Sequence, residues 1–100
     1  MIDISPEYFL IIKNILKEHF PELEVRAFGS RIDGKAKKFS DLDLVLVGKA
    51  KLDWQRLEAL KDAFAASNLP FMVDVVDWHA IRPEFRRLIE AGYEVIQKGE

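Results

Sequence analysis

The 100-residue sequence contains no cysteine, only two histidines and no long uninterrupted apolar segment. The absence of cysteine excludes disulfides, thiolate zinc sites and cysteine nucleophiles. His19 and His79 have no further histidine or cysteine ligands with which to build a zinc site. Acids and lysines interrupt the apolar positions of the first twenty residues, so we expect neither a signal peptide nor a membrane span. We therefore expect a cytoplasmic protein.

The chain also has little excess charge of either sign and no linker, repeat or low-complexity tract. Its net charge is −2, so we expect no direct nucleic-acid binding through bulk charge. Apolar residues make up 49% of the chain and charged residues 32%, which is ordinary for a globular protein. The length and composition predict a single domain over residues 1–100.

Apolar spacing along the chain predicts alternating helices and strands. Helical periodicity runs over residues 6–20, with Ser5 as the N-cap and a proline at the first helical position. A second helix is predicted from the cap Asp53 over residues 53–67, and a last one over residues 83–92. The predicted strands cover residues 23–28, 41–47, 71–76 and 93–96. This order predicts an α/β or α+β fold, with a small mixed β-sheet packed by helices.

The most informative motif joins a Gly29-Ser30 turn to Asp41 and Asp43, across a spacer of ten residues. Side chains alternate faces along a strand, so the two carboxylates share a face, with Cα atoms roughly 6.6 Å apart. Two ionised carboxylates this close repel each other unless a cation lies between them. Mg²⁺ commonly takes one or two protein carboxylates together with substrate phosphates. The motif therefore predicts a site for a metal and a nucleotide.

A third carboxylate, Asp74, interrupts the apolar run of the third predicted strand. Taken alone, it is explained by a strand-end aspartate bound to backbone donors or an arginine. Together with Asp41 and Asp43, it completes the ligand set of a two-metal phosphoryl-transfer site. Asp77 lies an odd number of positions further on, so we expect it on the opposite face, capping the turn before the last helix.

The Gly-Ser turn fits the same chemistry, because backbone N–H groups at the start of a short helix bind phosphates. Glycine at Gly29 lets the backbone approach closely, and the Ser30 hydroxyl adds a donor. Arg31 and the lysines of the following loop place positive charge beside the pocket, although a plain turn and a solvated loop are the alternatives. These lysines are Lys35, Lys37 and Lys38.

Taken together, the motifs resemble the signature of the nucleotidyltransferase superfamily typified by DNA polymerase β: Gly-Ser, a spacer, Asp-x-Asp and a third aspartate. The chain looks most similar to the minimal nucleotidyltransferases, the MNT group. The matching segments are Gly29-Ser30-Arg31 with Gly34, and the Val-Asp-Val-Val-Asp run at residues 73–77. The resemblance implies a polymerase β-like fold and transfer of a nucleoside monophosphate from an NTP, with ATP as the expected donor.

The resemblance also implies roles for individual residues. Asp41 and Asp43 would bind two Mg²⁺ ions, for which Mn²⁺ could substitute, and Asp74 would complete one metal site and act as the base. Gly29, Ser30 and Arg31 would hold the nucleotide. Larger family members carry an additional helical domain, for which this chain has no residues left.

Minimal members of the family are often paired with a small helical HEPN protein in a toxin–antitoxin system. We therefore expect a HEPN-type partner that the chain adenylylates as its antitoxin. The first alternative is a non-catalytic antitoxin that neutralises its partner by contact, and the second is a metal-dependent glycosyltransferase. The cluster of Asp41, Asp43 and Asp74 favours the enzyme, since a protein that only binds its partner has no need of three clustered acids. Exposed apolar surface near the site is expected to include Phe39, Trp54 or Trp78, with the tryptophans in the core or at an interface.

Overall fold

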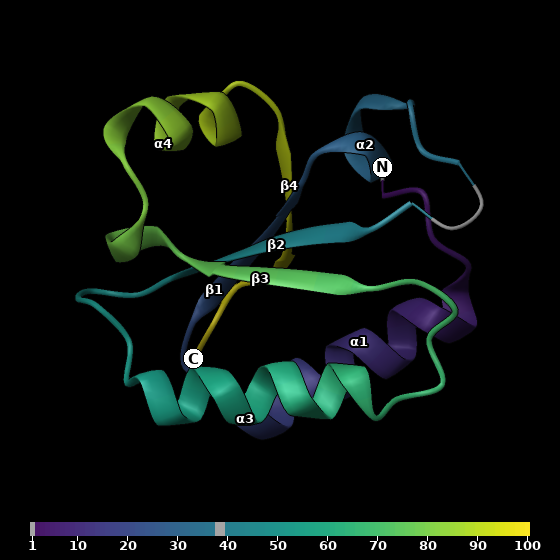
Figure 1. Cartoon of the computed structure of the whole chain (residues 1–100), viewed down its shortest axis with the longest axis horizontal. Helices are drawn as coiled ribbons and strands as arrows, with labels where there is room; N and C mark the ends of the chain where they lie inside the picture. Colours follow the sequence, from purple (N-terminus) through teal and green to yellow (C-terminus); the bar gives the residue numbers. More distant parts are fainter. Residues whose placement is uncertain (1, 38–39) are drawn as a thin grey trace.

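The computed structural model describes residues 2–37 and 40–100, in which a four-stranded sheet separates two layers of helices (Figure 1). The sheet order is β3-β2-β1-β4; β1 is antiparallel to β2 and β4, whereas β2 and β3 are parallel. The mixed sheet confirms the predicted fold class. The elements are α1 (Pro6–His19), β1 (Glu24–Phe28), α2 (Ser30–Asp33), β2 (Leu42–Val47), α3 (Trp54–Ala65), β3 (Val73–Asp77), the 3₁₀ turn η1 (Trp78–Ala80), α4 (Pro83–Glu90) and β4 (Tyr93–Gln97).

The larger hydrophobic core lies between one face of the sheet and the helices α1 and α3. Burying this apolar surface supplies most of the driving force that holds the helices on the sheet. The helical periodicity predicted for residues 6–20 is confirmed: Ile12 and Leu16 of α1 are buried in this core, and Phe9 packs partly buried against it. The fully buried residues from the two helices and β2 are Ile12, Leu16, Leu42, Leu44, Leu46 and Leu60.

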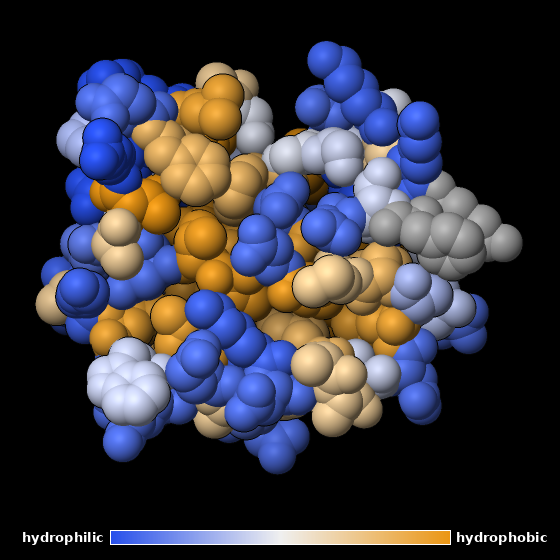
Figure 2. Space-filling view, in the orientation of Figure 1, coloured by the Kyte–Doolittle hydropathy of each residue, from blue (hydrophilic) through white to orange (hydrophobic). Residues whose placement is uncertain are grey.

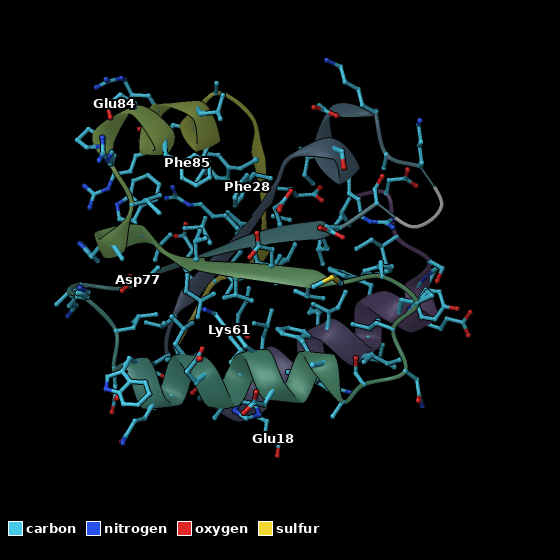
Figure 3. All side chains as sticks on the ribbon, in the orientation of Figure 1. Glu18, Phe28, Lys61, Asp77, Glu84 and Phe85 are labelled. Atoms are coloured by element: carbon cyan, nitrogen blue, oxygen red, sulfur yellow. The ribbon has the colours of Figure 1, made fainter. Side chains whose placement is uncertain are left out.

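The opposite face of the sheet carries a smaller core beneath α4, which lies above the sheet in Figure 1. Phe28, Val45 and Ile89 are its buried members. Phe85 of α4 packs edge-on against Phe28, with ring centroids 5.6 Å apart, and both side chains lie between helix and sheet in Figure 3. The helix that covers this face of the sheet is thus α4.

The helix and strand boundaries depart from the predictions by at most two residues. β2 begins at Leu42, one residue after Asp41, and β3 begins at Val73, two residues after the predicted start. Asp53 caps α3 as predicted, accepting a hydrogen bond from Gln55 N at 2.9 Å. Ser5 occupies the N-cap position of α1, but its side chain makes no capping hydrogen bond.

The expected cap at Asp77 is confirmed, because its carboxylate accepts hydrogen bonds from the amides of His79 and Leu52. Trp54 is 69% exposed and so is not a core residue, whereas Trp78 is half-buried. Phe39 and Lys38 lie outside the described residues. Within the ranges 2–37 and 40–100, no helix combines the length and apolarity needed to span a membrane.

Candidate active site

Two of the three predicted site carboxylates are direct neighbours in the sheet. The register of the parallel β2–β3 pair places Asp43 opposite Asp74, and Phe28 of β1 flanks Asp43 on its other side. Register partners on adjacent strands lie about 4.8 Å apart and share a face of the sheet. Asp43 and Asp74 therefore project together from the face that α4 covers, as expected.

Asp41 lies beside this pair, rather than within the same strand. Because β2 begins only at Leu42, the strand pleat does not fix the direction of the exposed Asp41 side chain. No group of three or more His, Cys, Asp or Glu side chains in the described part of the chain is gathered closely enough to hold a metal ion. Joint coordination by Asp41, Asp43 and Asp74 therefore requires a change of side-chain rotamer.

The carboxylates interact electrostatically across the site. Burial raises the pKa of Asp43 above its ordinary value, and the charges of Asp74 and Asp41 raise it further. Each of these effects disfavours the ionised form of Asp43. A bound cation would favour the ionised form instead, and carboxylate oxygens are the donors that hard divalent ions prefer. The donor chemistry thus fits a divalent metal.

The raised pKa of Asp43 predicts how the stability of the metal-free protein depends on pH. Since folded Asp43 holds its proton more tightly than unfolded Asp43, stability falls as pH rises from the ordinary aspartate pKa through the raised one. At neutral pH, Asp43→Asn should therefore raise the melting temperature in EDTA, by roughly 4–8 °C for each kcal/mol of unfavourable free energy removed. Thermal melts below and above this pH window provide the measurement. A variant that is less stable than wild type at neutral pH would contradict the electrostatic account.

The Gly29-Ser30 turn lies directly against Asp43. Gly29 follows β1 with φ 84° and ψ −155°, a conformation that is essentially restricted to glycine. A Cβ at Gly29 would overlap Oδ2 of Asp43. Ser30 then begins α2, which closes at Gly34 with φ 82°. The expected proximity of turn and carboxylate is confirmed, while the binding of a nucleotide by Gly29 and Ser30 stays a prediction.

Arg31 occupies a structural position beside the site. Its side chain is 6% exposed, and its guanidinium donates to Ser40 O at 2.8 and 3.0 Å and to Asp3 O at 2.8 Å. It also stacks over the Phe71 ring, with Cζ 4.3 Å from the ring centroid. These contacts tie the N-terminal segment and the loop before β2 to α2. A nucleotide-binding role for Arg31 stays a prediction that this geometry does not favour.

A cavity of about 630 Å³ opens above Asp43 and Asp74 and reaches α4. The apolar wall of this cavity was not predicted from the sequence. It contains Phe85 and the 67% exposed Leu88. Phe85 and Leu88 lie three positions apart on the last predicted helix, and this spacing indicated that they share one face of it. The complete lining is Phe28, Gly29, Ile32, Asp33, Asp43, Asp74, Val76, Phe85, Leu88, Ala91 and Gly92.

Known proteins resemble this chain in sequence and in fold. The family model "Polymerase beta, Nucleotidyltransferase" matches residues 11–100. A Haemophilus influenzae protein named "Probable protein adenylyltransferase MntA" is 46% identical over 99 residues, which cover 99% of this chain and 87% of that protein.

Two solved structures share the fold at low sequence identity. One, described as a toxin–antitoxin with AMP-PNP, superposes with a TM-score of 0.68 at 21% identity, covering 92% of this chain and 74% of that one. The other contains a tri-AMPylated Shewanella oneidensis HEPN toxin in complex with an MNT antitoxin. Its TM-score is 0.63 at 18% identity, covering 95% of this chain and 73% of that one.

Proposed function

Because the chain belongs to the polymerase β nucleotidyltransferase family, we propose that it transfers AMP from ATP to a hydroxyl group of a HEPN-type partner protein, as the antitoxin of a toxin–antitoxin pair. The observation that carries this proposal is the register pair Asp43–Asp74 beside the Gly29-Ser30 turn. The similarity to the H. influenzae protein over nearly the whole chain supports AMP as the transferred group and a protein as its acceptor.

The nucleotide would occupy the cavity between the carboxylates and α4. Backbone amides at a helix start suit phosphate oxygens, and α2 begins at Ser30, directly after the glycine that lies against Asp43. The Ser30 hydroxyl adds a donor, and the glycine at Gly29 permits close approach. Asp43, Asp74 and Asp41 would hold the divalent ions, for which we propose two Mg²⁺ or, in substitution, Mn²⁺. When bound, such ions neutralise phosphate charge and polarise the reacting oxygens.

The proposed reaction is a displacement at the α-phosphorus of ATP. The acceptor hydroxyl oxygen forms a bond to the α-phosphorus, and the bond from that phosphorus to the α,β-bridging oxygen breaks. Pyrophosphate leaves with the electron pair of that bond. The carboxylate of Asp74 accepts the hydroxyl proton, since it is exposed at the edge strand of the sheet, where an acceptor can approach.

The proposal is tested by transfer of label to the product of the gene that neighbours the gene for this chain. We expect label from the α-phosphate of ATP to enter the partner and the partner mass to rise by whole AMP units. Label on the γ-phosphate should not transfer, which distinguishes adenylylation from phosphorylation. A stable complex that takes up neither label would support neutralisation by contact instead. Family membership removes the glycosyltransferase alternative.

Ser30→Ala tests the phosphate-binding turn. It removes one hydrogen bond to a charged group, which contributes roughly 1.5–3 kcal/mol. The Kd of a non-hydrolysable ATP analogue should therefore rise by about one to two decades, with an unchanged melting temperature. Ser5→Ala, at the exposed N-cap of α1 where the side chain makes no capping hydrogen bond, provides the matched control. If both variants bind the analogue as wild type does, the phosphates bind elsewhere.

A further inference from the structure

We propose that the acceptor segment of the partner protein binds as an added β-strand along the free edge of β3. This inference rests on the proposed function and specifies how the acceptor reaches the site. The occupant is an extended segment whose hydroxyl-bearing residue has apolar neighbours on either side. Three features of the molecule support this binding mode: the free edge of β3, the groove beside it and the position of Asp74.

The free edge belongs to β3, which is the terminal strand of the sheet in its described part. Leu42 N of β2 donates to Met72 O at 2.9 Å, so the backbone groups of Met72 face β2. Because these groups alternate in direction along a strand, those of Val73 and Val75 face away from the sheet. Neither lysine nor proline interrupts β3, although both are common protections of an exposed edge.

A groove of about 760 Å³ runs beside this edge, between β3 and α3. Figure 2, which views the molecule from the β3 side, shows an apolar band across the middle of this surface. Phe64 and Leu69 line the groove together with the 73% exposed Met72. Lys61 of α3, seen between that helix and β3 in Figure 3, also lines the groove and forms an ion pair with Glu58. The groove thus offers apolar contacts on its α3 side.

The same groove is continuous with the carboxylate site, since Asp41 and Asp74 also line it. A strand paired to β3 would lie about 4.8 Å from it, with side chains alternating between the two faces of the extended sheet. The residue opposite Asp74 would then project on the carboxylate face, where its hydroxyl meets the proposed base. Its two neighbours would project toward α3 and its apolar groove.

Charge favours a partner segment over a second copy of this chain. Antiparallel pairing of two β3 strands centred on Val75 would bring the two Asp74 carboxylates to diagonal positions, about 7–8 Å apart. Because each Asp74 lies opposite Asp43 of its own chain, this pairing would gather four carboxylates on one face of the extended sheet. A partner segment with a neutral hydroxyl side chain opposite Asp74 introduces no such repulsion.

Val73→Pro tests the added strand directly. Proline is tolerated at the first residue of a strand, and the Val73 N–H faces the free edge, so no bond to β2 is lost. Val73→Ala is the matched control, because it shortens the same side chain and keeps the N–H. We expect the KM for the partner to rise roughly ten-fold in Val73→Pro relative to Val73→Ala. The Kd for the ATP analogue should agree between the two variants.

Amide hydrogen exchange of the wild-type protein provides a second measurement that needs no substitution. The Val73 and Val75 amides should exchange rapidly in the free protein and become protected when the HEPN-type partner and a non-hydrolysable ATP analogue are added. Equal KM values for the two Val73 variants, or unprotected Val73 and Val75 amides in the complex, would overturn the added strand and leave AMP transfer standing. A wild-type chain that transfers no AMP would overturn both proposals.

Discussion

Asp74→Asn is expected to reduce AMP transfer by about 10²–10⁴-fold, the usual range for loss of a general acid–base group. The substitution keeps the side-chain volume but removes the carboxylate that accepts the hydroxyl proton. Asp74 is exposed, and none of the hydrogen bonds found among the described residues involves its side chain. Its loss should therefore leave the fold and the Kd for the ATP analogue nearly unchanged. Single-turnover transfer with labelled ATP provides the measurement.

Asp62→Asn is the matched control for this prediction, because it makes the same chemical change on the exposed surface of α3. It should transfer AMP at the wild-type rate. Wild-type transfer by Asp74→Asn would remove Asp74 from the chemistry. Unfolding of Asp74→Asn, without a selective effect on transfer, would make Asp74 a structural residue.

Gly29→Ala is expected to have the second large effect, acting on both stability and transfer. An alanine at φ 84° and ψ −155° costs on the order of 1–3 kcal/mol in backbone strain. Its Cβ would also displace the Asp43 carboxylate from its present position. We expect a melting temperature lower by roughly 4–8 °C for each kcal/mol, and loss of most transfer activity. Thermal melts and the labelled-ATP assay measure the two effects.

Substitutions at two other glycines separate the effect of backbone strain from that of the contact with Asp43. Gly34 also has a positive φ, at 82°, but in the left-handed region with ψ 9°, and an added Cβ there meets no atom within 4 Å, so Gly34→Ala measures the cost of a positive φ without a contact. Gly92 lines the same cavity without a left-handed φ or a nearby atom, so Gly92→Ala should keep the wild-type melting temperature. If Gly29→Ala matches Gly34→Ala in transfer activity, the contact with Asp43 has no functional role.

Much of the fold follows from local sequence patterns. Apolar periodicity identified every helix of eight residues or more, and the alternation in β2 separated Leu42 and Leu44 in the larger core from Asp43 on the opposite face. The parity of Asp74 and Asp77 likewise predicted one carboxylate at the site and the other at a cap. Period-two patterns are reliable here because a shift of one residue would bury charge and expose leucine.

The remaining features depend on tertiary pairing, which local patterns do not encode. The order β3-β2-β1-β4, and hence the free edge of β3, arises from long-range strand pairing. The same motif that suggested nucleotide contact for Arg31 gave no sign of its contacts with Ser40 and Asp3, because those partners are distant in sequence. The position of Asp41 outside β2 has a local cause, because the strand begins one residue later than predicted.

Nucleotide-dependent metal binding tests the carboxylate site most directly. Calorimetric titration of Mg²⁺ should give weak binding to the free wild-type protein, and tighter binding with a non-hydrolysable ATP analogue whose phosphates complete the coordination. Asp43→Asn removes a ligand charge with little change in volume, so it should lose this nucleotide-dependent increase. Equal nucleotide-dependent Mg²⁺ binding by wild type and Asp43→Asn would contradict the assignment of the site.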